Sequence, residues 1–143
     1  MPHVVILYTG NLESEAGMSQ LCRKLADTML SVRDEAGKQV FPTGGTRVYA
    51  LPAPHFAVAD GGAAGRAAGG TGDYGFIYIN LRMGRGRTAQ VQKAAGDVLL
   101  DVAKAHVAPL MARRHLGLTL QIDESPSQVY DGKFGNLHSL FQA

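Results

Sequence analysis

The chain has 143 residues, of which 45% are hydrophobic, and a net charge of only +2. This composition predicts a single globular domain over residues 1–143, and it excludes a disordered chain or a strongly basic nucleic-acid-binding protein. No charged leader precedes the first apolar run, and no run reaches the ~20 residues of a membrane span. We therefore expect a cytoplasmic protein with no membrane contact. The single cysteine, Cys22, excludes an internal disulfide, and its apolar surroundings predict a buried thiol.

The first half of the chain, about residues 1–58, has the pattern of a strand, a helix and a second strand. Residues 3–8 are almost wholly apolar and β-branched, which predicts a strand covered on both faces. Apolar residues recur at helical spacing through 13–35. Residues 46–58 should be extended, and Pro52 predicts an edge strand because proline cannot donate a ladder hydrogen bond.

A segment rich in glycine and alanine, residues 59–73, separates this half from a second one. Glycine is costly to order and these residues have little to bury, so we expect a flexible loop. The second half, about 73–123, repeats the pattern with strands at 74–81 and 116–122. Between them, Thr88 is a suitable N-cap for the second helix.

Two features of the second half stand outside this repeat. Pro109 lies in the last third of the predicted helix, where it should kink or interrupt the helix. A C-terminal tail, residues 124–143, begins polar and ends in an apolar stretch at 136–141. We expect that stretch to dock against the domain.

Two successive β-α-β units define the expected architecture. A crossover helix makes the flanking strands of each unit parallel, with a right-handed connection. Fusion of the two units predicts an α/β fold with a four-stranded mixed sheet and two helices on one face. Because the strands are so apolar, we expect neighbouring subunits to cover the other face.

The N-terminal stretch Met1-Pro2-His3 contains a candidate acid/base group. The small residue after Met1 favours removal of the methionine, which would leave Pro2 as a free secondary amine. An ordinary α-amino group has a pKa of roughly 8, so such a nitrogen can exchange a proton near neutral pH. On these residues alone, the simpler interpretation is that Pro2 merely begins a strand, where its missing N–H is harmless.

Arginines are the other residues with potential for binding. Arg82, Arg85 and Arg87 lie between a strand and the start of a helix, and Arg47 lies at the start of the second strand. Guanidinium groups near a helix N-terminus favour carboxylates and phosphates. Taken alone, the cluster is more simply a solvated basic turn.

Several kinds of site are missing from the sequence. There is no P-loop, no dinucleotide-binding glycine motif following a strand, and no nucleophile elbow. The five histidines lack metal-ligand spacing with one another or with the cysteine. Basic residues are not interleaved with aromatic ones, as single-strand nucleic-acid binding requires. We therefore expect no cofactor, no metal and no nucleic-acid partner.

Taken together in chain order, several short segments resemble the 5-carboxymethyl-2-hydroxymuconate isomerase family of the tautomerase superfamily. They are Met1-Pro2-His3, Phe41-Pro42 with Gly45-Thr46-Arg47, Ala59-Asp60-Gly61, Asp73-Tyr74 with Phe76, Leu81–Arg87 and Asn136–Phe141. Each segment alone is a weak signal, but the ordered set spans nearly the whole chain.

The resemblance implies a function and a set of roles. Members are homotrimeric, cofactor-independent keto-enol tautomerases whose mature N-terminal proline is the acid/base group, which assigns that role to Pro2. Family arginines that bind substrate carboxylates correspond to Arg47 and Arg87 and, less directly, to Arg82. The implied substrate is 5-carboxymethyl-2-hydroxymuconate, a multi-carboxylate dienol of homoprotocatechuate breakdown, which is converted to its 2-oxo isomer.

Some features depart from the family pattern and keep two alternatives open. The departures are Leu7, Tyr49, Pro109 and the length of the 59–73 loop. Arg66 in that loop could belong to a lid over the site, although a disordered insertion is the simpler interpretation of the loop. One alternative is another oxo-acid enzyme of the superfamily, such as a 2-hydroxymuconate tautomerase. The other is a non-catalytic trimeric binding protein with the same fold.

Overall fold

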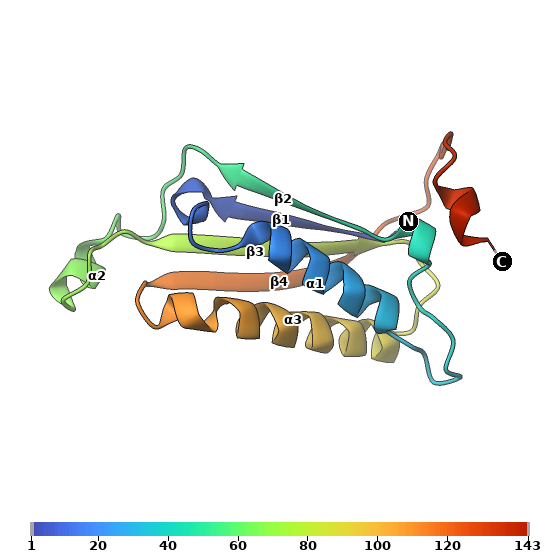
Figure 1. Ribbon diagram of the computed structural model, residues 1–143, viewed down its shortest axis with the longest axis horizontal. Coiled ribbons are helices and arrows are strands. Elements are labelled where there is room, and N and C mark those ends of the chain that lie inside the picture. The colour runs from blue at the N-terminus through green and yellow to red at the C-terminus, as the bar shows by residue number, and fades with distance from the viewer. Residues whose placement is uncertain (1, 143) are drawn as a thin grey trace.

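A computed structural model describes residues 2–142 of the chain, so Met1, whose removal we expect, lies outside the described residues. Strands and helices alternate as the two predicted β-α-β units require (Figure 1). The elements are β1 (His3–Thr9), η1 (Gly10–Leu12), α1 (Met18–Ser31), η2 (Thr43–Gly45), β2 (Arg47–Ala53), α2 (Ala63–Ala67), β3 (Gly75–Met83), α3 (Ala89–Met111), β4 (Leu116–Glu124) and η3 (His138–Phe141).

The four strands form one mixed sheet in the order β2-β1-β3-β4. Each unit contributes a parallel pair, β1 with β2 and β3 with β4, and the units join through the antiparallel pair β1 and β3. The long helices α1 and α3 lie side by side on the same face of the sheet (Figure 1). This confirms the predicted α/β architecture. It also confirms that β2, which contains Pro52, is an edge strand.

The hydrophobic core lies between this face of the sheet and the two helices. Alternate residues of the central strands point into it, because successive side chains of a strand face opposite ways. The large side chains with less than 2% exposure are Phe41, Ile6, Leu12, Leu21, Leu25, Met29, Ile77, Ile79, Leu81, Met83, Leu99 and Val4. Each such aliphatic side chain stabilises the fold by about 1.5–3 kcal/mol relative to an exposed one.

The opposite face of the sheet has no helix over it. Leu7, Tyr49 and Leu51 lie on that face and are 47%, 51% and 53% exposed. The predicted strand covered on both faces is therefore covered on one face only within a single chain. An apolar surface of this kind is the one that the trimer prediction requires, and the trimer itself stays a prediction.

Both helices differ from their predicted extents. α1 begins at Met18 rather than near residue 13, because Gly17 at its N-cap has a left-handed conformation with φ of 58°. It ends at Ser31, since Val32 is already extended. α3 continues through Pro109 to Met111, so Pro109 does not interrupt the helix, and the other predicted outcome, a kink, stays a prediction. Pro109 lies in the last turn, where a missing N–H removes only one of the final backbone hydrogen bonds.

The glycine-rich segment 59–73 contains the short helix α2, which its composition did not predict. The Asp60 carboxylate accepts hydrogen bonds from the backbone N–H groups of Gly62 and Ala64, both at 2.9 Å. The Gly65 N–H donates to the Tyr74 hydroxyl at 2.7 Å. These bonds satisfy backbone donors that would otherwise remain open at a helix start. The segment therefore has a defined local structure.

The C-terminal tail returns to the domain, as its apolar end predicts. η3 packs against η2 at the end of the sheet where β1 begins (Figure 1). A Cβ atom on Gly44 would lie 2.5 Å from the Nδ1 atom of His138 and 3.2 Å from a ring carbon of Phe141. A larger residue at position 44 would require these two tail side chains to move. Cys22, in contrast, is partly exposed rather than buried as predicted, and the burial that it has raises the pKa of its thiol.

Candidate active site

Residues from three strands meet at the end of the sheet where β1 begins. Because β1 and β3 are antiparallel, the first residue of β1, His3, pairs with Arg82 near the end of β3. On its other side, His3 pairs with Arg47, the first residue of β2. Pro2 directly precedes this row and is buried. The fold thus brings three of the four predicted site residues into this row or directly next to it.

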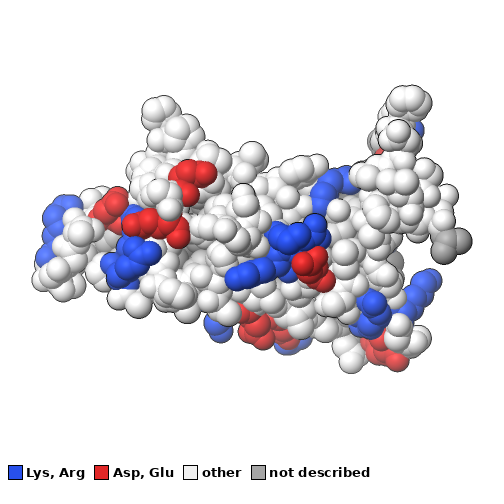
Figure 2. Space-filling view, in the orientation of Figure 1, with Lys and Arg blue, Asp and Glu red and all other residues white. Residues whose placement is uncertain are grey.

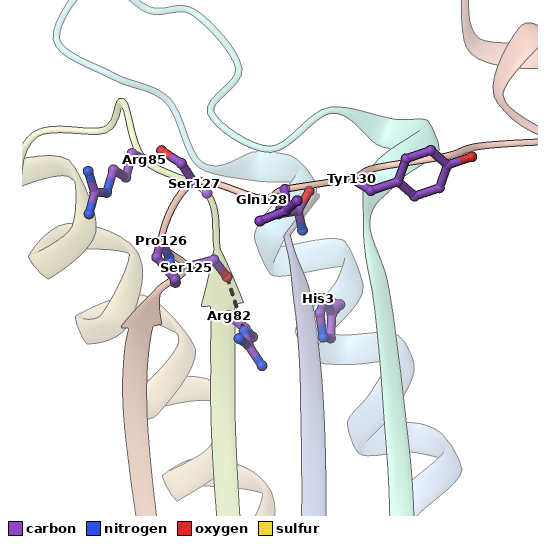
Figure 3. A pocket seen from close by; sticks show the side chains of 10 residues that line it. His3, Arg82, Arg85, Ser125, Pro126, Ser127, Gln128 and Tyr130 are labelled. Atoms are coloured by element: carbon purple, nitrogen blue, oxygen red, sulfur yellow. Dashed lines mark hydrogen bonds between the residues drawn. The ribbon is translucent and has the colours of Figure 1, made fainter.

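A cavity of about 810 Å³ opens beside this row (Figure 3), a size typical of small-molecule sites. The sheet contributes His3 and Arg82, the glycine turn after β3 contributes Arg85, and the tail segment 125–130 crosses the strand ends to form the rim. Among the described residues that line the cavity, two are arginines and none is acidic. A lining of this charge favours an anionic ligand.

The Arg82 side chain is held in place by the tail. Its Nε–H donates to Ser125 Oγ at 3.0 Å, and the Ser125 N–H donates to the Met83 carbonyl at 2.7 Å. Asp123 is the β4 residue paired with Arg82, but its carboxylate accepts a hydrogen bond from the Asn80 amide at 2.7 Å. No ion pair between Arg82 and Asp123 occurs within residues 2–142, so the guanidinium remains available to a ligand.

Arg87 lies away from this cavity, on the helix side of the sheet. Its Nη1 and Nη2 atoms donate to the carbonyls of Gly84 and Val40 at 3.3 and 3.2 Å. The guanidinium carbon lies 5.2 Å from the centre of the Phe41 ring. Partial burial lowers the pKa of this guanidinium. The structure therefore does not bring Arg87 and Arg82 into one cavity.

Arg47 borders a separate hollow of about 530 Å³ between α1, η2 and the tail. Its Nη1 atom lies 3.5 Å from the Gly45 carbonyl, at the limit of a hydrogen bond. Leu137 and Phe141 of the tail form the outer wall. Arg47 is thus two strands away from Arg82, with His3 of β1 between them.

Other classes of site find little support in the described part of the chain. Residues 2–142 contain no group of three or more side chains able to hold a metal ion together. None of the helices there has both the length and the apolar character needed to cross a membrane. On the face drawn in Figure 2, positive and negative side chains are interspersed, whereas a nucleic-acid site needs a basic stripe.

A sequence profile for 5-carboxymethyl-2-hydroxymuconate isomerase matches residues 2–141, nearly the whole chain. The chain belongs to this isomerase family. The crystal structure of a 5-carboxymethyl-2-hydroxymuconate delta-isomerase is 62% identical, with a TM-score of 0.95 over 100% of this chain and 94% of that chain. The crystal structure of a 5-carboxymethyl-2-hydroxymuconate isomerase from Deinococcus radiodurans R1 is 31% identical, with a TM-score of 0.79 over 99% and 95% of the two chains.

A further relative is the 5-carboxymethyl-2-hydroxymuconate Delta-isomerase of Escherichia coli. It is 29% identical over 142 residues, which cover 99% of this chain and 100% of that protein. The structure of native fused 4-OT, 17% identical with a TM-score of 0.52, shares the fold alone. The isomerase class and the tautomerase-type fold expected from the sequence are thereby confirmed.

Some residues of the site in this isomerase-family chain were missed from the sequence. The sequence places His3 in a strand and in the Met1-Pro2-His3 segment, but gives it no role in the site, although strand alternation puts it on the sheet face opposite to that of the buried Val4. Ser125 and Tyr130 lie in a tail whose path depends on long-range packing, so no local signal could find them. The glycine-rich segment that contains Arg66 lies at the opposite end of the sheet (Figure 1), so it cannot cover this cavity within one chain.

Proposed function

We propose that the protein is a cofactor-independent isomerase that converts 5-carboxymethyl-2-hydroxymuconate to its 2-oxo isomer. The observation that carries this proposal is the cavity at the end of the sheet where β1 begins, in a chain of this family. The described residues that line it include two arginines and no acidic side chain, and Pro2 directly precedes His3 of this lining without being part of it. Three relatives bear the name of this isomerase. The reaction needs one proton removed from the 2-hydroxyl group and one delivered to a carbon of the conjugated chain.

Pro2 is the proposed acid/base group. After removal of Met1, its secondary amine would accept the hydroxyl proton and then deliver it to carbon, so that one group performs both transfers. Pro2 is buried beside the row that contains Arg82. Burial and nearby positive charge both disfavour the protonated amine, which keeps the nitrogen available as a base. The same positive charge stabilises the dienolate formed between the two steps.

The arginines have different proposed roles. Arg82 and Arg47, on either side of His3, would bind substrate carboxylates. Arg87 carries the same role by family resemblance, but its guanidinium contacts two backbone carbonyls and an aromatic ring. We therefore assign it a supporting role, in which its bond to Gly84 fixes the turn after β3.

We also propose that the working unit is a homotrimer. The helix-free face of the sheet exposes Leu7, Tyr49 and Leu51, and the tail residues Val129 and Phe134 are fully exposed. Packing of this face against other copies would remove that apolar surface from water. Sedimentation equilibrium would give the mass of three chains, and a mass of one chain would contradict the proposal.

The function is tested by following loss of the dienol absorbance with 5-carboxymethyl-2-hydroxymuconate and with 2-hydroxymuconate. Intact-mass spectrometry must first establish that Met1 is absent from the wild-type and Pro2→Ala proteins. Acid/base catalysis by a side chain typically contributes 10²–10⁴-fold, so Pro2→Ala should lower kcat at least about 100-fold. A processed Pro2→Ala variant with wild-type kcat would refute the role of Pro2. No turnover of either substrate by the wild type would favour the non-catalytic alternative.

A further inference from the structure

Arg85 is a positive group at the cavity that neither the packing of the chain nor the proposed chemistry uses. It lies in the turn between β3 and α3, and its side chain is exposed. No hydrogen bond or ion pair engages its guanidinium within residues 2–142. The following residue, Gly86, has a φ of 118°, a conformation that favours glycine, so the turn itself requires that glycine but places no demand on Arg85.

The position of Arg85 differs from that of Arg82. Figure 3 shows Arg82 on the sheet, one strand from His3, whereas Arg85 and Ser127 lie beyond the strand ends, with the Arg85 guanidinium turned away from Ser127. A substrate whose hydroxyl group reaches Pro2, the residue before His3, would pass the row that contains Arg82. A branch on that substrate would extend away from the strands, toward the tail segment and Arg85.

The substrate of the proposed reaction has such a branch. 5-Carboxymethyl-2-hydroxymuconate has three carboxylates, two at the ends of its chain and one on the carboxymethyl group, while 2-hydroxymuconate has only the first two. An arginine fork binds a carboxylate through two parallel hydrogen bonds, and hydroxyl groups can supply another donor. Arg85 and Ser127 both line the cavity, and the exposed Arg85 side chain, which no hydrogen bond or ion pair within residues 2–142 holds, can turn toward a ligand to provide these donors with Ser127.

We infer that Arg85, with Ser127 of the tail, binds the carboxymethyl carboxylate and thereby selects tricarboxylate dienols over dicarboxylate ones. This inference rests on the proposed function and extends it from reaction type to substrate selection. Loss of the branch carboxylate or loss of the guanidinium removes the same contact. The two changes should therefore not be additive, as is usual for directly interacting groups.

The test is the ratio of kcat/KM for 5-carboxymethyl-2-hydroxymuconate to kcat/KM for 2-hydroxymuconate. We expect Arg85→Gln to lower this ratio about tenfold, the effect of one lost hydrogen-bonded contact to a charged group. Arg85→Lys, which keeps the charge but not the fork, should retain more of the ratio. Arg113→Gln is the matched control, because it removes the same charge just beyond the far end of α3, and it should leave the ratio unchanged.

The outcomes separate this inference from the proposed function. An active wild type whose ratio is unchanged in Arg85→Gln overturns the inference and leaves the isomerase proposal standing. The inference also fails if Arg113→Gln lowers the ratio as much as Arg85→Gln does. The effect would then come from the net charge of the protein and not from a contact made by Arg85. A wild type with no activity on either substrate overturns both.

Discussion

Replacement of Arg87 distinguishes a structural role from the substrate-binding role that family resemblance gives it. Arg87→Met keeps a side chain of similar length over the Phe41 ring but removes every donor. The carbonyls of Gly84 and Val40 then lose their hydrogen bonds, which measure 3.3 and 3.2 Å. The connection before β2 and the turn after β3 would no longer be joined through one side chain.

The expected cost follows from these contacts. Each hydrogen bond contributes about 1 kcal/mol net. A guanidinium over an aromatic ring, here 5.2 Å from its centre, contributes roughly 0.5–1 kcal/mol at a partly exposed site. The free energy of unfolding of Arg87→Met should therefore fall by about 2–3 kcal/mol. Arg113→Met is the control, because its surface ion pair with Glu15 contributes at most about 1 kcal/mol.

Urea unfolding followed by circular dichroism measures both variants. All samples need one protein concentration, because subunit association adds to apparent stability. The structural role predicts a lower urea midpoint of unfolding for Arg87→Met. It predicts only a small rise in KM, caused indirectly by displacement of the neighbouring turn. The reasoning would be refuted by a large rise in KM combined with an unfolding free energy within about 0.5 kcal/mol of wild type, the usual range for a surface substitution.

Three further changes test the fold by the same unfolding measurement. Thr88→Ala removes the N-cap bond to the Val91 N–H, 3.2 Å long, and should cost about 1 kcal/mol; Thr88→Ser should restore it. Leu99→Ala leaves a cavity between α3 and the sheet and should cost about 2–5 kcal/mol, and a cost below that of Thr88→Ala would contradict this packing. Burial, followed by the hydrogen bond to Glu13, raises the pKa of Tyr8 to about 12. Because an unfolded tyrosine ionises near a pH of about 10, the unfolded state loses its proton first and stability should fall between about pH 10 and 12. Tyr8→Phe should remove that part of the fall.

The architecture was predictable because its signals are periodic and local. The apolar run at residues 3–8 and the helical spacing after it define one unit, and the second unit repeats them. The misjudged details depend on individual conformations. The left-handed backbone of Gly17 moves the start of α1, and the Asp60 carboxylate organises α2 through specific hydrogen bonds. Amino-acid composition predicts neither the conformation of Gly17 nor the hydrogen bonds of Asp60.

The candidate site was predictable only in part. Residue type and chain position pointed to Pro2, Arg47 and Arg82, which the sheet then gathers at one end. The location of Arg87 on the helix side depends on where Phe41 packs, a contact between connections far apart in the sequence. The rim depends on the path of the tail, which long-range packing determines.

The antiparallel junction between the two β-α-β units has a consequence for stoichiometry. The counterpart of Pro2 in the second unit is Tyr74, just before β3, and it lies at the opposite end of the sheet because β1 and β3 run in opposite directions. Its nitrogen is a peptide amide, which cannot titrate. Fusion therefore leaves one terminal amine for every two units, and any assembly of these chains has half as many proposed catalytic centres as β-α-β repeats. The second end of each sheet is free to carry structure instead, and α2 lies there.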